Sequence, residues 1–158
     1  MQKNTWMSYL FWILLTEAVG LLSGLLTRNA SQIFNESIIQ PPLSPPASLF
    51  PVIWTILYAL MGISAARISI QPPSKDRSKG LLLFLTQLAV NFFWSPIFFN
   101  AQAFGLAFLW LLLLRFLSWK MVRIFYKSDP IAAYLQIPYL LWLTFAVYLS
   151  GGIWYLNR

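Results

Sequence analysis

The sequence predicts an all-α membrane protein, a bundle of five transmembrane helices. The overall composition, the presence of five long apolar runs and the lack of short alternating segments all predict this fold class. Of the 158 residues, 59% are hydrophobic and only 9% are charged. A soluble domain carries about 25% charged residues because its surface faces water. This composition therefore indicates a surface that faces lipid.

A helix needs about 20 mostly apolar residues to cross the hydrocarbon layer of a bilayer. Five runs meet this requirement, at about residues 7–26, 46–66, 81–99, 104–122 and 131–156. The first contains Glu17, the fourth contains Arg115 with Lys120 near its end, and the others are uncharged. Because lipid offers no partners for backbone polar groups, each run should be a helix. Residues 1–158 then form one domain.

A cleaved signal peptide is the alternative for the first run, because Lys3 precedes its apolar stretch. Thr16 and Glu17 do not form a small-residue cleavage site, however, and the apolar pattern resumes as far as Leu26. We therefore favour an uncleaved first span.

Five spans place the N-terminus and two of the four connections on one side of the membrane. That side carries eight basic residues: Lys3, Arg67, Lys75, Arg77, Lys79, Lys120, Arg123 and Lys127. The other side carries only Arg28 and Arg158. Cytoplasmic loops are rich in Lys and Arg, so we expect the N-terminus inside and the C-terminus outside. The net charge of +7 then reflects topology. Lipid headgroups, and no nucleic acid, are the expected partners of these loops.

The chain lacks the residues that several kinds of metal binding and catalysis require. It contains no His and no Cys, which excludes disulfides, thiolate chemistry and His-ligated zinc or haem. It also has no phosphate-binding glycine loop and no carboxylate pair at helical spacing. We therefore expect no metal site, no cofactor and no enzymatic activity.

The connection at residues 27–45 is the longest, and we expect it on the outer side. Pro41, Pro42 and Pro45, followed by Pro46, make its second half stiff and extended, since proline fixes φ and lacks an N–H. It is either a spacer before a helix that begins at Pro46 or a rigid lid over a site between the helices.

Uncommon residues fall at similar depths beneath this connection. At 1.5 Å per residue, Trp54, Asn91 and Glu17 lie about 12–14 Å below the outer ends of their spans, and Trp142 about 18 Å. Gln87 and Asn91 lie one turn apart and should turn the third span inward, because polar side chains avoid lipid.

Helical spacing extends this group to a candidate ligand-binding set, because residues at i+3 and i+4 share a face. The set is Trp54, Tyr58, Gln87, Asn91, Trp94, Trp142, Phe145, Ala146 and Leu149. Trp54, Trp94 and Trp142 lie too deep for the interfacial aromatic belt. They either fill the core or form the walls of a cavity for a flat aromatic ligand.

Charged and small residues within the spans raise further possibilities. Glu17 and Arg115 are functional candidates, because charge within the membrane is costly. Glu17 is expected to be protonated, to pair with Arg115, to bond a polar group of the cavity or to assist proton movement. The alternative for Arg115 is that it extends its charge toward the inner surface. Gly20 and Gly24, four residues apart, allow a close helix approach.

Four segments occur in an order and spacing that match a known family. They are residues 41–46 (PPLSPP), 50–62 (FPVIWTILYALMG), 87–99 (QLAVNFFWSPIFF) and 138–146 (PYLLWLTFA). They resemble the TspO/translocator protein family, also called tryptophan-rich sensory proteins or peripheral-type benzodiazepine receptors. The resemblance implies a five-helix bundle, often dimeric, with a ligand cavity closed by the first loop. It implies that Trp54, Tyr58, Asn91, Trp142 and Ala146 line this cavity.

The sequence departs from the family pattern at several positions. The family usually has Trp-Tyr where Phe34 and Asn35 stand, Trp at Leu43 and an acidic residue at Trp110. It has an aromatic residue where Gly151 stands. In some bacterial members, Trp at that position and at the Trp54 position is associated with light- and oxygen-dependent porphyrin breakdown. Only Trp54 is present here, so we expect no strong degradative activity.

Porphyrins, haem-related tetrapyrroles, sterols and benzodiazepine-like drugs are the ligands that the resemblance implies. The sterol pattern formed by Leu149, Tyr155 and Arg158 is weak and uses residues other than the family's, so no sterol partner is expected. Without His or Cys, iron would be ligated only weakly, by Met61 or Tyr58. Metal-free porphyrin should therefore bind about as well as haem.

These observations predict an integral membrane binding protein of the sensor or transport type. Its ligands would be porphyrin, tetrapyrrole-like and drug-like planar molecules, with porphyrin as a ligand and not a cofactor. A Trp-dependent porphyrin-degrading enzyme and a structural or partner-binding membrane protein are the alternatives. We expect a homodimer in a bacterial cytoplasmic membrane, with an organelle membrane as the alternative.

Overall fold

The computed structural model describes residues 2–158, and every regular element in this range is a helix. The helices are α1 (Gln2–Ser37), α2 (Leu49–Ser69), α3 (Lys75–Ser95), α4 (Phe104–Ser128), α5 (Pro130–Leu135) and α6 (Ile137–Leu156), with a π-helical turn η1 (Pro96–Asn100) after α3. They form five spans long and apolar enough to cross a membrane, with α5 and α6 together making the fifth. The fold class predicted from the sequence is confirmed.

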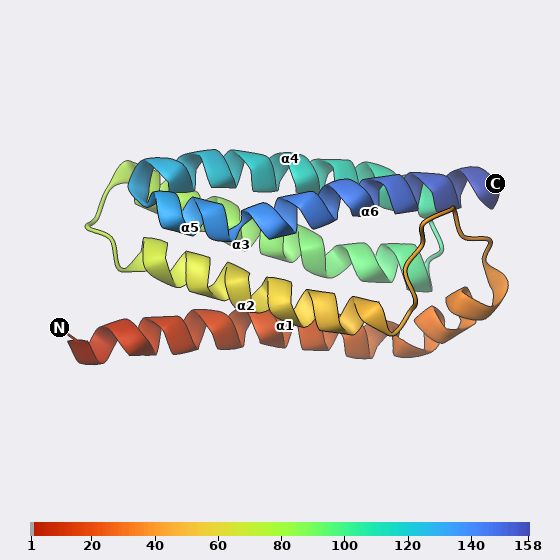
Figure 1. Cartoon of the computed structure of the whole chain (residues 1–158), viewed down its shortest axis with the longest axis horizontal. Coiled ribbons are helices and arrows are strands. Elements are labelled where there is room, and N and C mark those ends of the chain that lie inside the picture. The colour runs from red at the N-terminus through yellow and green to blue at the C-terminus, as the bar shows by residue number, and fades with distance from the viewer. Residues whose placement is uncertain (1) are drawn as a thin grey trace.

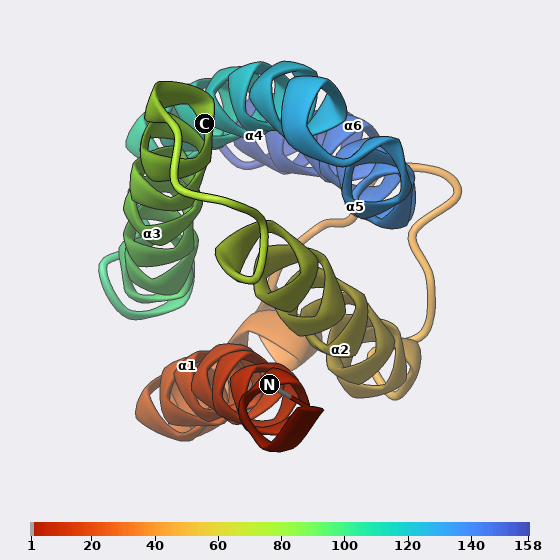
Figure 2. The ribbon, with the colours of Figure 1, turned by 90° about the vertical axis from the view of Figure 1, so that its left-hand side faces the viewer.

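The long helices lie side by side, and the two termini lie at opposite ends of the bundle (Figure 1). The spans are arranged as a ring in the order α1, α2, α5–α6, α4 and α3, with α3 and η1 returning to α1 (Figure 2). We call the end that holds the N-terminus the basic end and the opposite one the strap end. The helix α2 packs closely on α5 near the basic end but has few contacts with α6.

The first helix is longer than the sequence predicts. Residues 27–37, expected in the connection, continue α1 to Ser37. At 1.5 Å per residue α1 is about 54 Å long, well beyond the hydrocarbon thickness, and its last turns bend away from the first ones (Figure 1). Phe34 is buried there against Phe98, Phe99 and Phe104, with ring centroids 5.1–6.2 Å apart. These contacts stabilise the last turns of α1 as helix.

Close packing between α1 and α2 depends on one glycine from each helix. A Cβ at Gly62 would lie 2.6 Å from the Cα of Ile13, and a Cβ at Gly20 would overlap the Tyr58 ring. The Thr16 hydroxyl donates a hydrogen bond of 2.7 Å to the Tyr58 carbonyl across this contact. A Cβ at Gly24 would meet nothing within 4 Å. The close approach expected at Gly20 and Gly24 thus uses Gly20 and Gly62.

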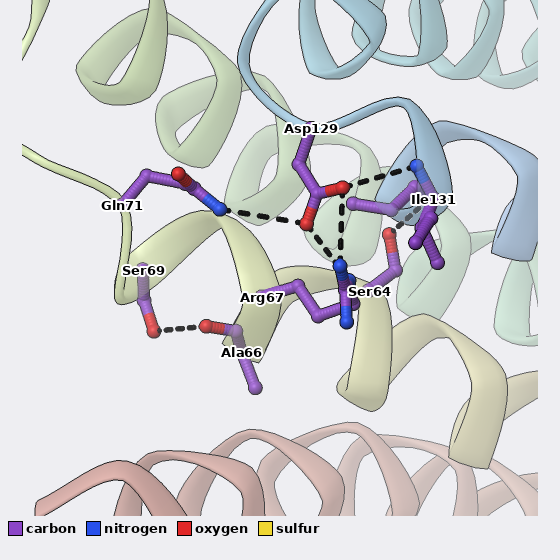
Figure 3. A network of polar contacts seen from close by, with 8 residues as sticks. Ser64, Ala66, Arg67, Ser69, Gln71, Asp129 and Ile131 are labelled. Atoms are coloured by element: carbon purple, nitrogen blue, oxygen red, sulfur yellow. Dashed lines mark hydrogen bonds and ion pairs between the residues drawn. The ribbon is translucent and has the colours of Figure 1, made fainter.

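An ion pair joins α2 to α5 at the basic end (Figure 3). Arg67 Nε donates to Asp129 Oδ2 at 2.7 Å, and Arg67 Nη2 donates to Oδ1 at 3.3 Å. The same carboxylate caps α5 by accepting from the Ile131 amide at 3.0 Å, while the Ser64 hydroxyl donates to the Ala132 carbonyl at 2.7 Å. Burial alone would raise the pKa of Asp129, but these hydrogen bonds and the Arg67 charge lower it.

Two indole groups join α3 to α4 in opposite directions. Trp94 Nε1 on α3 donates to the Ala107 carbonyl of α4 at 3.2 Å. Trp110 Nε1 on α4 donates to the Val90 carbonyl of α3 at 2.7 Å. Since a buried indole N–H needs an acceptor, these bonds orient both rings toward the α3–α4 interface.

Candidate functional site

A chain of neutral hydrogen bonds crosses the middle of the bundle. Tyr58 Oη on α2 donates to Asn91 Oδ1 on α3 at 2.8 Å, and Asn91 Nδ2 donates to Tyr139 Oη on α6 at 2.8 Å. Tyr139 Oη in turn donates to Gln87 Oε1 at 2.8 Å, and the Ser118 hydroxyl of α4 donates to the same atom at 3.5 Å. The chain joins four helices, and none of its side chains is more than 6% exposed.

One donor of this chain is unused. Gln87 Nε2 is buried and has no hydrogen-bond partner within residues 2–158. A buried polar atom without a partner is costly, so the site has one group that a ligand acceptor or a water molecule would satisfy.

An aromatic group lies beside this chain, between α2 and α6. The Trp54 ring lies 5.4 Å from Tyr58, 6.3 Å from Tyr139 and 6.4 Å from Trp142, measured between centroids. Phe50 lies 5.7 Å from Trp142 and Phe145 lies 5.6 Å from it. Both indoles are half-buried. The structure therefore places Trp54 and Trp142 beside the polar chain that contains Asn91.

The other residues of the candidate set lie further from the polar chain. Trp94 packs against Phe98 at 4.8 Å and faces α4, so it does not join the Trp54 group. Phe145 lies between Trp142 and Tyr148. Ala146 is half-buried on α6 and Leu149 is buried nearer its outer end.

The rings of Trp54, Tyr58, Tyr139 and Trp142 pack against one another at this site, with centroids 5.4–6.4 Å apart. Two surface hollows lie elsewhere, one between α4 and α5–α6 and the other along the start of α1. A planar ligand would therefore have to separate the aromatic rings of α2 from those of α6.

The proline-rich connection, residues 38–48, is here called the strap, and it lies against the end of α6 (Figure 1). Asn157 Oδ1 accepts from the Ile39 amide at 3.0 Å, and Asn157 Nδ2 donates to the Ile39 carbonyl at 2.8 Å. Tyr148 Oη donates to the Pro42 carbonyl at 2.7 Å. Pro41 is buried, and it lies so close to α6 that a Cβ at Gly152 would be 2.8 Å from the proline ring.

The strap is extended rather than helical through most of its length. Leu43 has a φ of 68° and is 81% exposed, which marks a sharp change of chain direction at the middle of the proline segment. Pro45 is half-buried and Pro46 is exposed. The helix α2 begins at Leu49 and not at Pro46.

The two charges inside the spans do not pair. Arg115 is exposed on α4 and its Nε donates to Thr144 Oγ1 of α6 at 2.9 Å. Glu17 is half-buried on α1, and the salt bridge recorded among residues 2–158 joins Arg67 and Asp129 instead. The expected alternative of a Glu17–Arg115 pair is therefore wrong for this structure.

Comparison with known proteins shows which family the chain belongs to. The sequence profile of the TspO/MBR family matches residues 12–156, which include the last four spans and most of the first. The chain belongs to the TspO/MBR family.

Relatives in this family come from bacteria and from animals. The chain is 37% identical to "Protein CrtK" of Rhodobacter capsulatus, over 77% of each chain. It is 35% identical to "Tryptophan-rich protein TspO" of Chlorobaculum tepidum, over 89% of each chain. It is 32% identical to "Translocator protein" of Bos taurus, over 97% of this chain and 92% of the relative.

Gly151, where the resemblance described above implies an aromatic residue, packs closely against α4. A Cβ at Gly151 would lie 3.0 Å from the Phe108 ring of α4. An aromatic side chain would need Phe108 to move. Gly151 therefore faces α4, whereas Trp54 faces Trp142 across the gap between α2 and α6.

Sequence reasoning missed three residues of the site: Tyr139, Ser118 and Phe50. Tyr139 lies one turn before Trp142, and the i+3 rule applied backwards from Trp142 would have found it. Ser118 and Phe50 carry no comparable signal, because small hydroxyls and phenylalanines are common in membrane helices.

Proposed function

We propose that this TspO/MBR protein is an integral membrane binding protein of the sensor or transport type for planar, porphyrin-like and drug-like ligands. The single observation that carries the proposal is the pair of half-buried indoles, Trp54 and Trp142, directly beside the buried polar chain of Tyr58, Asn91 and Tyr139. Mostly apolar walls with a few placed polar groups are typical of small-molecule sites.

The ligand would enter between α2 and α6 near the strap end, where the two helices have few backbone contacts. Trp54 and Trp142 are perpendicular, with an interplanar angle of 90°. Rotation of one indole would offer two parallel faces for a flat ring system, and stacking of this kind contributes about 0.5–1.5 kcal/mol per pair beyond burial. The free Gln87 Nε2 donor would then serve a ligand carbonyl or carboxylate.

Binding, and not catalysis, is the role proposed. Residue 151 is a glycine that packs against Phe108. Trp54 therefore lacks the second aromatic residue that the family resemblance links to porphyrin breakdown. The basic end supports a topology with the N-terminus inside, and a bacterial cytoplasmic membrane is the membrane that we propose.

The test is a titration of the full chain with protoporphyrin IX, read from the absorbance of the porphyrin. Wild type should show saturable binding, and Trp54→Ala or Trp142→Ala should raise the Kd about tenfold, because each removes a stacking wall. Trp6→Phe is the matched control, since Trp6 is 59% exposed on α1. Equal affinity of all four proteins, or no saturation in wild type, would contradict the proposal.

A second titration compares metal-free porphyrin with haem. The chain offers no His or Cys as an axial ligand, so the two Kd values should agree within about threefold. A large preference for haem would show that the iron is ligated and would refute this part of the proposal.

A further inference from the structure

A groove lies on the outside of the bundle at the basic end, between α4 and the junction of α5 with α6. Its volume is about 340 Å³. One wall comes from the last turns of α4, where Arg123 and Lys127 are four residues apart and share a face. The other wall comes from Tyr134 of α5 and Ile137 at the start of α6.

The positive charges on this groove are not neutralised by acidic residues. Within residues 2–158 the recorded salt bridge is that of Arg67 with Asp129. Asp129 follows α4 directly in sequence, but its carboxylate points toward Arg67 of α2 and pairs with it (Figure 3). Arg123 instead lies over the Trp119 ring at 5.1 Å, and both Arg123 and Lys127 are exposed.

The remaining lining is apolar or amphipathic. Val122 and Ala133 contribute aliphatic surface beside Ile137. Tyr126 and Tyr134 meet edge to face at 6.0 Å, and both are more than half exposed. The groove thus combines a cationic rim and tyrosine hydroxyls with an apolar wall.

This combination matches one class of ligand. Arg and Lys bind phosphate oxygens through charge-assisted hydrogen bonds, and basic pockets between transmembrane helices bind the headgroups of anionic lipids. A soluble phosphate would use only the rim. A phospholipid would also use the apolar wall, which continues along exposed Ile131, Ile137 and Leu141.

We propose that the groove between α4 and α5–α6 binds the phosphate headgroup of an anionic membrane phospholipid, with an acyl chain along α6. The site is separate from the porphyrin site proposed above, and it uses none of the same residues. It would place a lipid molecule against α5, the helix that Asp129 caps and that Arg67 joins to α2.

The experiment measures lipid binding to the purified full chain by native mass spectrometry, with phosphatidylglycerol and phosphatidylcholine as probes. Wild type should bind phosphatidylglycerol at least tenfold more tightly. Arg123→Gln with Lys127→Gln should weaken phosphatidylglycerol binding at least tenfold, because each basic residue near an anionic headgroup contributes roughly fivefold. Lys75→Gln with Lys79→Gln is the matched control, with the same charge loss at the same end, outside the groove.

Three outcomes would overturn the proposal. One is equal binding of the two lipids to wild type. Another is an equal loss of phosphatidylglycerol affinity in the control pair, which would indicate diffuse surface charge instead of a site. The third is displacement of the lipid by glycerol phosphate at equal concentration, which would show that a soluble phosphate suffices. A loss confined to the groove variant, with glycerol phosphate ineffective, supports a lipid site.

Discussion

The two ends of α2 are held in different ways. Near the basic end, α2 contacts α5 through an ion pair, through the Ser64–Ala132 hydrogen bond and through buried core residues. Near the strap end, α2 faces α6 across the rings of Phe50, Trp54 and Trp142, and backbone contact between the two helices is slight.

This difference indicates which end of α2 is fixed to its neighbours and which end is free to separate from α6. Hydrogen bonds and a partly buried ion pair fix the geometry of the basic end, whereas ring contacts join α2 to α6 at the strap end. The basic end therefore acts as a fixed joint. Under the proposed function, the strap end is the part that a ligand would widen. Each prediction below tests one side of this contrast.

The largest effect is expected at the fixed joint. Asp129→Asn removes the charge that pairs with Arg67. Because the Arg67 side chain is 30% exposed, we expect a loss of about 2 kcal/mol, less than for a fully buried pair. Thermal unfolding in detergent, followed by circular dichroism, measures it. Glu36→Gln, on an exposed residue of α1, is the control and should leave the midpoint unchanged.

A pH titration should show part of the same stabilisation in the wild type. The pKa of Asp129 is lowered in the fold from its ordinary value of 3.8. The stabilisation is therefore fully present above that ordinary value and is lost as the pH falls through the lower pKa of the folded protein. The thermal midpoint of wild type should fall more steeply below pH 4 than that of Asp129→Asn. If the thermal midpoints of the two proteins changed with pH in parallel, Asp129 would not be the group responsible for the loss of stability.

A smaller effect is expected from the polar chain at the middle of the bundle. Tyr139→Phe removes the hydroxyl that accepts from Asn91 and donates to Gln87. We expect a loss of about 1 kcal/mol, measured by the same unfolding experiment. The comparison variant is Tyr148→Phe, which loses one exposed hydrogen bond to Pro42 and should cost less. The reverse order would show that the strap stabilises the fold more than the polar chain does.

The smallest change in stability is expected at the strap. Asn157→Ala removes both hydrogen bonds to Ile39, which are exposed to solvent, so the loss should stay below about 1 kcal/mol. Hydrogen exchange of residues 38–48 should nevertheless become faster, with α5 unaffected. Exchange that rises equally at α5 would contradict the independence of the two ends.

The spans of this fold are predictable because hydropathy determines them, but the end of α1 is not. Residues 27–37 contain Arg28, Asn29 and Glu36, and such polar residues are typical of a connection. The helix continues because Phe34 meets Phe98 and Phe104 from distant parts of the chain. A long-range contact of this kind has no signal in local sequence.

The centre of the site was predictable for a related reason. Gln87 and Asn91 are exceptional in an apolar span, so their inward orientation follows from the cost of polar groups in lipid. Trp94 was assigned to the same face, but its indole N–H found an acceptor on α4. Which neighbour satisfies an indole depends on helix packing, which the sequence does not specify.

The docking of the strap has a consequence for how far the bundle can open. Ile39 and Pro42 are bonded to α6, while Leu49 begins α2. Only residues 43–48 connect the two attachments, and six residues reach roughly 20 Å when fully extended. This segment is a tether with a fixed maximum length. It would let the outer part of α2 move away from α6 while the strap stays attached. Under the proposed function, its length would therefore limit the size of the ligand that fits between the two helices.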